Sequence, residues 1–422
     1  MPADETRAHR EAFEQALRLK RQAPVPHQEP GTPAGRSSDG QVLCPYCLEH
    51  IQLDLAQLFV TDSRMQYKPL DVSTIGNALR RQDVMRGAVQ KCTADRDFPE
   101  HFIPVPYLTY GRPLTVAMVG QSSTGKSHLL TQMIAEITDG GLEPFGLKWQ
   151  SVNPEQHARF VRERVQPLRN GKVLDHTGAL GLDGFARFVE SLLITDAHGQ
   201  VRPVAFFDLG GEDLVRTDAA LRFLLGIDAL IFVVDPALAL RLPHLDHARE
   251  RWGVEVNRDG DLAFGTVLDR LPKNGPYLDV AAAMVLGKAD LLRFQPPVDR
   301  WLGRAPATSL DPERTREESR TCTGCCDSTP AWPGCAPSTR SAGAPCMSRR
   351  PPAARRNRAA IRRGGARRVL EPLLALLALH GMVEVPGGAE AFAVERRPRS
   401  RRCRRRGPDE PGSGGSRGIR AR

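Results

Sequence analysis

Short apolar runs recur through the middle of the chain and are separated by longer amphipathic or polar stretches. Helical spacing follows the first run, with apolar side chains at Leu130, Met133, Ile134 and Ile137. Such alternation is typical of a central, mostly parallel sheet with helices on both faces, an α/β fold. The runs that we predict as strands begin at Leu114 or span Phe188–Thr195, Pro203–Asp208, Ala229–Asp235 and Ala281 onwards.

The flanks of this region have a different pattern. Residues 1–40 suggest a charged helix and a Pro/Gly/Ser linker, and residues 41–112 a small cysteine-containing module whose last part, Phe98–Arg112, is an extended lead-in. Residues 113–303 form the predicted α/β domain. Residues 304–422 are an irregular basic tail, in which an apolar stretch predicts one helix at 369–381.

The charge is divided unevenly. The chain of 422 residues has a net charge of +10; up to Gly303 there are 34 basic and 38 acidic residues (34 − 38 = −4), and beyond it 25 and 11 (25 − 11 = +14). The body therefore carries no excess of positive charge, which argues against nucleic acid as a partner. No run approaches the roughly 18 apolar residues of a membrane span, and no secretory signal is evident, so we expect a cytoplasmic protein.

The tail suggests a hypothesis about the gene. Residues 321 to about 367, and those after about 394, consist largely of Arg, Pro, Ala, Gly and Cys without periodicity, whereas a regular helical pattern lies between them. Shifted GC-rich codons yield this composition. We therefore hypothesise that these two stretches are translated out of the original frame; the alternative is a disordered basic tail.

Three cysteines in the body are candidate zinc ligands. Cys44 and Cys47 lie across a turn, as in one knuckle of a zinc ribbon, and a structural zinc site needs four ligands. Cys92 is a third candidate ligand. The residue three positions after it, where a second knuckle would place a cysteine, is Asp95. His50 and His101 are the nearby alternatives. A cluster of reduced cysteines in a small subdomain would give the same pattern.

The strand at Leu114 leads into the pattern G-x-x-x-x-G-K-[ST], the Walker A loop. Glycines there let backbone N–H groups and the next helix approach a polyphosphate. Lys126 can reach the β- and γ-phosphates and the Ser127 hydroxyl can ligate Mg²⁺. We assign nucleotide binding to residues of this loop and of the first helical turn, namely Gly120, Ser123, Thr124, Gly125, Lys126, Ser127 and His128.

A D-x-x-G sequence follows a second apolar strand. Asp208 can hold Mg²⁺ through a water molecule, and Gly211 offers a backbone N–H to a γ-phosphate. Glu212 comes next, and a carboxylate there can accept a proton from water but cannot donate to the γ-phosphate. We therefore expect slow hydrolysis, accelerated by a partner protein that supplies a cation.

The strand at Ala281 ends in Gly287-Lys288-Ala289-Asp290. Guanine-specific loops have the form [NT]-K-x-D, in which the aspartate accepts two hydrogen bonds from guanine and the lysine covers the ring. Lys288 and Asp290 fit this form, whereas Gly287 departs from it, because the Asn or Thr that ties this loop to the phosphate loop is absent.

With these three motifs the chain resembles the Ras-like GTPases of the P-loop class, and more closely the bacterial double-GTPase proteins. The resemblance covers about residues 40–303 and the helix at 369–381. It implies a GTP-hydrolysing switch, Mg²⁺ as cofactor, a protein effector, and Thr177 as the switch threonine, with Thr195 as its alternative. Two other functions stay open: an ATPase, and a module that binds nucleotide without turnover.

Overall fold

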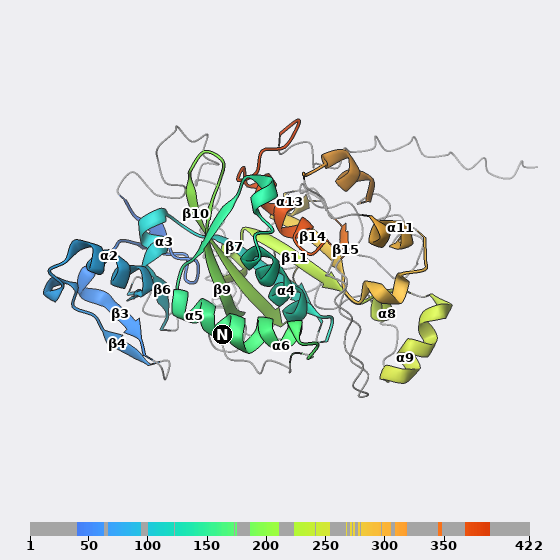
Figure 1. Cartoon of the computed structure of the whole chain (residues 1–422), viewed down its shortest axis with the longest axis horizontal. Helices are drawn as coiled ribbons and strands as arrows, with labels where there is room; N and C mark the ends of the chain where they lie inside the picture. Colours follow the sequence, from blue (N-terminus) through green and yellow to red (C-terminus); the bar gives the residue numbers. More distant parts are fainter. Residues whose placement is uncertain are drawn as a thin grey trace, which may run out of the picture.

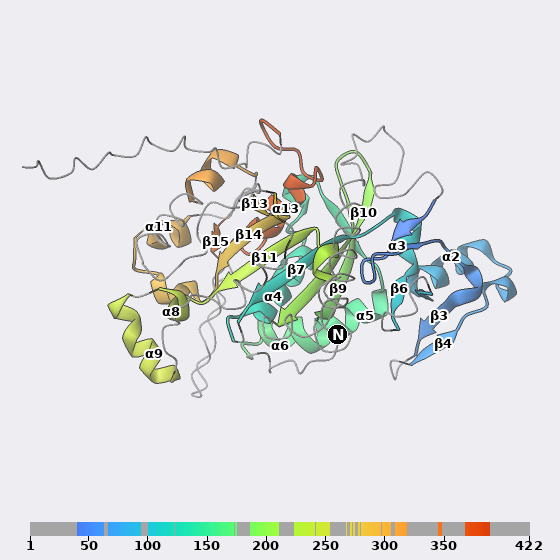
Figure 2. The same cartoon turned by 180° about the vertical axis from the view of Figure 1, so that it is seen from behind.

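The computed structural model of the chain is drawn in Figures 1 and 2. The structure describes residues 40–62, 66–93, 100–121, 123–172, 174, 186–210, 223–240, 242–253, 267, 271, 273–274, 277–278, 280–296, 298–304, 309–318, 345–347 and 368–388. In this part of the chain, no helix is long and apolar enough to cross a membrane.

A mixed sheet of six strands, lengthened at one edge by the three-residue strand β15, forms the centre of the molecule (Figure 1). Its order is β15-β14-β11-β7-β10-β9-β8. The five strands from β15 to β10 are parallel, and β9 and β8 add antiparallel pairs. The predicted α/β fold is confirmed. The strands are β7 (Leu114–Gly120), β8 (Lys148–Ser151), β9 (Ala186–Thr195), β10 (Val201–Gly210), β11 (Ala229–Val234), β14 (Ala281–Leu286) and β15 (Pro345–Met347).

Side chains of the central strands alternate between two cores. On β7, Val116 and Met118 belong to one cluster, whereas Ala117 and Val119 belong to the other. All of them are fully buried, because helices cover both faces of the sheet. This double burial is why the strands are apolar along their whole length rather than at every second residue.

Two groups of helices supply these covers. The first group consists of α4 (Lys126–Thr138), α5 (Pro154–Phe160), the π-turn η4 (Val161–Val165) and α13 (Glu371–Leu379). The short helix α6 (Gln166–Arg169) continues from η4 and contacts α4. The second group, on the other face, consists of α3 (Val105–Tyr110), the helical residues 223–226, α8 (Pro236–Ala239), η6 (Pro243–Leu245), η7 (Ala289–Leu292) and α11 (Val298–Gly303). The remaining elements of the domain are η3 (Glu143–Phe145), α9 (Asp246–Trp252), β12 (Lys273–Asn274) and β13 (Tyr277–Leu278).

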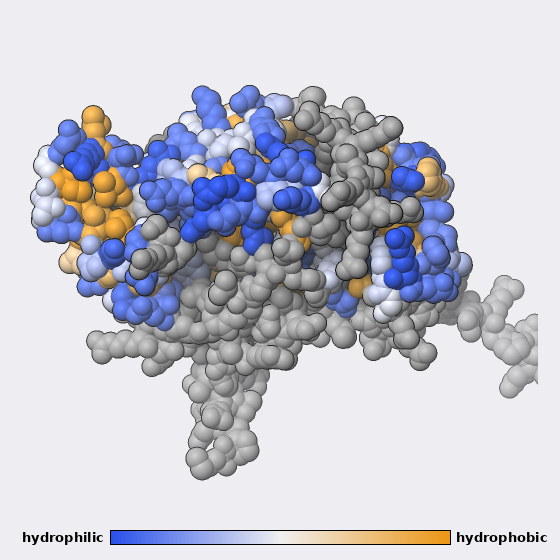
Figure 3. Space-filling view, turned by 60° about the horizontal axis from the view of Figure 1, so that its bottom comes forward, coloured by the Kyte–Doolittle hydropathy of each residue, from blue (hydrophilic) through white to orange (hydrophobic). Residues whose placement is uncertain are grey.

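A small module precedes the sheet in sequence and lies beside β8 and β9 (Figures 1 and 2). It contains the hairpin β1 (Val42–Leu43)–β2 (His50–Ile51) and the antiparallel sheet β4-β3-β5-β6. Hydrophobic residues gather on the surface at its end of the molecule (Figure 3). Leu55, Tyr67 and Leu79 of this module are exposed. Its other elements are η1 (Leu55–Gln57), β3 (Leu58–Thr61), β4 (Tyr67–Pro69), η2 (Val72–Thr74), α2 (Ala78–Gly87), β5 (Val89–Lys91) and β6 (Phe102–Pro104).

The expected extended lead-in at Phe98–Arg112 is wrong over most of its described length. Only β6 is extended there, and helix α3 follows it directly. Pro106 lies in the first turn of α3, where a missing N–H breaks no helical bond, and Gly111 ends the helix with a φ of +98°. Pro106 is therefore as compatible with the start of a helix as with an extended chain.

Candidate functional site

The loop of residues 120–127 joins the carboxyl end of β7 to the start of α4. Gly125 has a φ of +100°, a backbone conformation that favours glycine, and it forms the N-terminal boundary of α4. The Lys126 ammonium donates to the backbone carbonyls of Gly120 and Gln121 at 2.6 and 2.8 Å. The loop thus holds a cation over its own backbone.

Other positions of the loop are fixed by close packing. The buried Thr124 hydroxyl donates to the carbonyl of Gln121 at 3.0 Å. A Cβ at Gly120 would lie 2.4 Å from the carbonyl oxygen of Val233, so only glycine fits beside β11. Ser123 is exposed and has a φ of +62°, a left-handed conformation that residues other than glycine seldom adopt.

Ser127 and Asp208, 81 positions apart in sequence, meet at the carboxyl ends of adjacent strands. The Ser127 hydroxyl donates to Asp208 Oδ2 at 2.7 Å. The parallel register of β7 and β10 brings them together, because it pairs Gly120 with Gly210. A hydroxyl and a carboxylate are oxygen donors of the type that Mg²⁺ prefers, which makes this pair a candidate magnesium site.

The loop at Gly287 lies directly against the loop of residues 120–127. The Gly287 N–H donates to the carbonyl of Val234 at 2.8 Å. A Cβ on Gly287 would lie 2.5 Å from the carbonyl oxygen of Thr124, a distance that no side chain tolerates. The departure from Asn or Thr at this position therefore has a steric reason: the two backbones touch where the pattern expects a side chain.

Lys288 and Asp290 follow on this loop. The Lys288 ammonium forms a buried ion pair with Asp235, and it lies 4.7 Å from the ring centroid of Trp252. Asp290, in the first turn of η7, is half-buried. Sequence reasoning missed Asp235 and Trp252 as partners of Lys288. A signal existed for Asp235, because it directly follows the apolar strand β11, much as Asp208 follows the apolar part of β10.

Some predicted site residues cannot be placed. Thr177, Gly211 and Glu212 lie outside the described residues, as does Asp95. His128, on α4, accepts a hydrogen bond at Nε2 from the backbone N–H of Leu174 at 3.1 Å. This bond ties the helix after the loop to the stretch of chain that leads toward Thr177.

The cysteine module contains a cluster of four buried metal-ligand side chains. Cys44, Cys47, Cys92 and His101 each place one ligand atom within 4.8 Å of the others. Cys44 Sγ lies 3.2 Å from His101 Nε2, and Cys47 Sγ lies 3.8 Å from Cys92 Sγ. Two sulfurs on a tetrahedral zinc with bonds of about 2.3 Å are about 3.8 Å apart. The cluster could hold zinc.

Two structural elements build this cluster. Cys44 and Cys47 lie in the turn between β1 and β2, where the Tyr46 N–H points at Cys44 Sγ at 3.4 Å. Cys92 follows β5 and His101 precedes β6, and the Cys92 N–H donates to the His101 carbonyl. The fourth candidate ligand is thus His101, whereas His50 is exposed on β2.

The surroundings of the cluster affect the protonation of its thiols. Burial raises the pKa of the Cys44 thiol well above its ordinary value, and the neighbouring Cys47 and Cys92 raise it further. Without a cation, the Cys44 thiol would therefore stay protonated. A zinc ion would compensate the charge of the thiolates and give each buried sulfur a bond.

The chain matches no known protein-family model, and a search of curated proteins finds no match either.

Proposed function

We propose that this chain is a magnesium-dependent GTP-binding protein that hydrolyses GTP slowly and acts as a nucleotide-dependent switch. The observation that supports it is the 2.7 Å hydrogen bond between Ser127 and Asp208. It joins the last residue of a phosphate-binding pattern to the aspartate of a D-x-x-G pattern. Two unrelated turns would have no reason to bring these two side chains together.

In this proposal the loop of residues 120–127 belongs to the P-loop class and binds the phosphates of the nucleotide. Backbone N–H groups and the N-terminus of α4 face the negative charge, and Lys126 adds a point charge. Magnesium, when bound, would neutralise charge on the β- and γ-phosphates. Ser127 would ligate it directly and Asp208 through water.

Base choice in this proposal falls to Asp290. Its carboxylate accepts two hydrogen bonds from guanine, which adenine cannot donate. Lys288 keeps its ammonium on Asp235, so its aliphatic stem is the part that covers the base. The turnover is slow because Glu212, beside Gly211, cannot donate to the γ-phosphate, and a partner protein with a cation would accelerate it.

The test is a binding titration of the full-length protein with GTP, GDP and ATP in the presence of Mg²⁺. We expect GTP and GDP to bind and ATP to bind at least about tenfold more weakly, a difference of about 1.4 kcal/mol. Lys126→Ala should abolish binding of the triphosphate. Lys148→Ala, which removes an exposed lysine of β8, is the matched control and should bind normally.

Asp290→Asn should weaken GTP binding and leave ATP binding unimproved. Equal affinity of the wild type for ATP and GTP would replace the guanine assignment by an ATPase. Binding without any turnover over hours would leave a nucleotide-binding module. Normal GTP binding by a folded Lys126→Ala protein would show that the loop is not the nucleotide site.

A further inference from the structure

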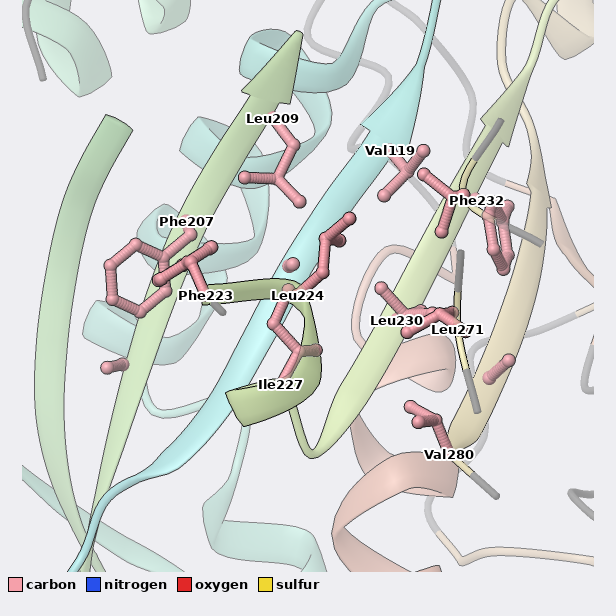
Figure 4. Close-up of a cluster of buried hydrophobic side chains, with 14 of the residues drawn as sticks. Val119, Phe207, Leu209, Phe223, Leu224, Ile227, Leu230, Phe232, Leu271 and Val280 are labelled. Carbon is pink, nitrogen blue, oxygen red and sulfur yellow. The ribbon is translucent and has the colours of Figure 1, made fainter. Parts of the chain in front are cut away.

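Tyr46 connects the metal cluster to the sheet. It lies between Cys44 and Cys47 and is only 5% exposed. Its ring centroid is 5.3 Å from that of His101, 5.9 Å from Phe207 in an edge-to-face arrangement, and 6.4 Å from Phe223 in a stacked one. Phe207 and Phe223 also contact each other, at 4.8 Å (Figure 4). Edge-to-face and offset-stacked rings are the favourable geometries for aromatic side chains.

One of the two phenylalanines that Tyr46 contacts, Phe207, directly precedes a residue of the candidate magnesium site. Phe207 is the residue before Asp208 on β10, so the cluster with Tyr46 fixes the backbone from which Asp208 projects to the other face. Asp208 in turn accepts from Ser127. A shift of Phe207 would therefore move the Asp208 carboxylate relative to the Ser127 hydroxyl.

The tip of the same turn presses on Gly226. A Cβ at Gly226 would lie 2.6 Å from Leu48 Cδ2 and 3.3 Å from the Pro45 carbonyl oxygen. The Gly226 carbonyl accepts from Arg112 at 2.7 Å and from Thr115, on β7, at 3.0 Å. The helical residues 223–226 are thus held between the metal-ligand turn and the first residues of β7.

Leu48 itself is in a conformation that needs support. Its φ is +63°, which a leucine adopts at a cost of about 1 kcal/mol or more. The hydrogen bond from the Leu48 N–H to the Cys44 carbonyl at 3.2 Å holds it there, together with the contact on residue 226. A metal that joins Cys44 to the other ligands would keep this turn rigid.

We infer that Tyr46 and Leu48 are positioning residues for Asp208: the metal-bound turn holds the end of β10, and thereby sets how the protein takes up magnesium. This inference rests on the proposed function. It assigns to the cysteine module a role in the nucleotide site. Neither zinc binding nor GTP binding by itself would imply this role.

The first experiment measures the Mg²⁺ concentration that gives half-maximal single-turnover hydrolysis at saturating GTP. Tyr46→Ala should raise it about tenfold, while zinc content stays at the wild-type level. Tyr46→Phe, which keeps the ring, should restore it to within about twofold. Phe160→Ala removes an equally buried aromatic from the opposite core, and should lower stability without moving the Mg²⁺ requirement.

A second set of variants covers the case in which Tyr46→Ala fails to fold. Gly226→Ala should push the turn away through Leu48 and raise the Mg²⁺ requirement. Because the nearest atom is the end of the Leu48 side chain, adding Leu48→Ala should make room and restore the wild-type value. A Tyr46→Ala protein, or a Gly226→Ala protein, with full zinc and an unchanged Mg²⁺ requirement would overturn the inference.

Absence of nucleotide binding by the wild type would refute the proposed function, and positioning is then judged by hydrogen exchange. In the full-length protein, removal of zinc with a chelator should speed exchange in peptides covering residues 203–208 and 223–227. The peptide of α13 should not change, since it packs on the other face. Equal exchange of the first two peptides with and without zinc would overturn the inference independently of nucleotide.

Discussion

At the residue scale, Gly287 shows how a departure from a sequence pattern can be a packing requirement. Its neighbour in space is the Thr124 carbonyl, and no Cβ fits between them. The contact that a side chain provides in the expected pattern is made here by the backbones of the two loops. The close contact at Gly287 therefore supports the proposal that the two loops belong to one site.

Restoring the expected residue should consequently do harm. Gly287→Asn forces the two loops apart, and we expect GTP affinity to fall at least about tenfold. Gly303→Ala is the matched control, because nothing lies within 4 Å of its added Cβ. The measurement is a GTP titration of both variants. Tighter binding by Gly287→Asn would mean that the loop has room for the side chain.

Zinc content tests the metal cluster at the level of single ligands. The purified protein should carry about one equivalent of zinc per chain, because the four donors match a structural site. His101→Ala should lose most of it, whereas His101→Cys should retain it. His50→Ala, at an exposed histidine of β2, should change nothing. Metal-free wild-type protein with freely titratable Cys44, Cys47 and Cys92 would instead support a cluster of reduced thiols.

Local spacing alone identifies some of these candidate residues but not others. Cys44 and Cys47 share one turn, and Lys126 and Ser127 share one loop, so the chain itself brings them together. His101 meets Cys92 because of the register of β5 and β6, and that register is set by packing across the module. Asp235 and Trp252 reach Lys288 through tertiary contacts that no local pattern encodes.

At the scale of elements, an ion-pair network joins α13 to the helical residues 312–318. Arg368 is buried and pairs with Glu318 and Glu371, and Glu318 also pairs with Arg304 at 2.7 Å. Burial opposes the charge of Arg368, but the two carboxylates outweigh it and raise the pKa of the guanidinium. The network therefore depends on every member staying in place.

Arg368→Met should lower the free energy of unfolding by about 3–5 kcal/mol, because it removes the buried cation that lies between the carboxylates of Glu318 and Glu371. Arg169→Ala breaks an exposed pair with Asp139 and should cost about 1 kcal/mol or less. Urea unfolding of both variants at neutral pH makes the comparison. A small effect of Arg368→Met would indicate that the network is hydrated.

His380, at the end of α13, should make stability depend on pH. Burial lowers its pKa to about 4 from an ordinary 6.5, an effect that Arg202 and Arg112 reinforce and Asp228 opposes. The unfolded chain therefore binds a proton that the folded one refuses, and stability falls as pH drops from 6.5 toward 4. His380→Gln should remove up to about 3 kcal/mol of this loss. Urea unfolding at pH 7 and pH 5 measures it; equal pH slopes for both proteins would contradict it.

The apolar pattern predicted the long strands well and the short elements poorly. β7, β10, β11 and β14 are buried on both sides, so their sequences are unmistakable. β8 was not predicted, because it has four residues and only half-buried or exposed side chains. α3 was not predicted, because it has only six residues and Pro106 lies in its first turn.

At the scale of the whole molecule, the described parts of the tail are joined to the domain. The helical residues 312–318 and α13 meet through Arg368, and α13 fills one face of the sheet with Leu373, Leu374 and Leu377. Residues 319–344 and 348–367, between them, lie outside the described residues. Their composition, rather than their structure, carries the hypothesis of a shifted reading frame.

Intact mass spectrometry of the protein made from the native gene tests this hypothesis. We expect a mass different from the 46.4 kDa of the printed sequence, with peptides of unshifted composition between residue 320 and α13. Peptides that include Glu371–Leu379 should be found unchanged, which is the internal control. A mass equal to that of the printed sequence would refute the shift and leave a basic tail.

The placement of the N-terminal module beside β8 has a consequence for self-association. β8 is an edge strand of the sheet, and such edges invite strand addition from other molecules. Here Lys148 puts a charge on the edge, and Arg86 of α2 donates to the Gln150 side chain at 2.7 Å. The module thus covers part of the open edge, and a fragment that begins after it would be prone to polymerise by β-strand pairing.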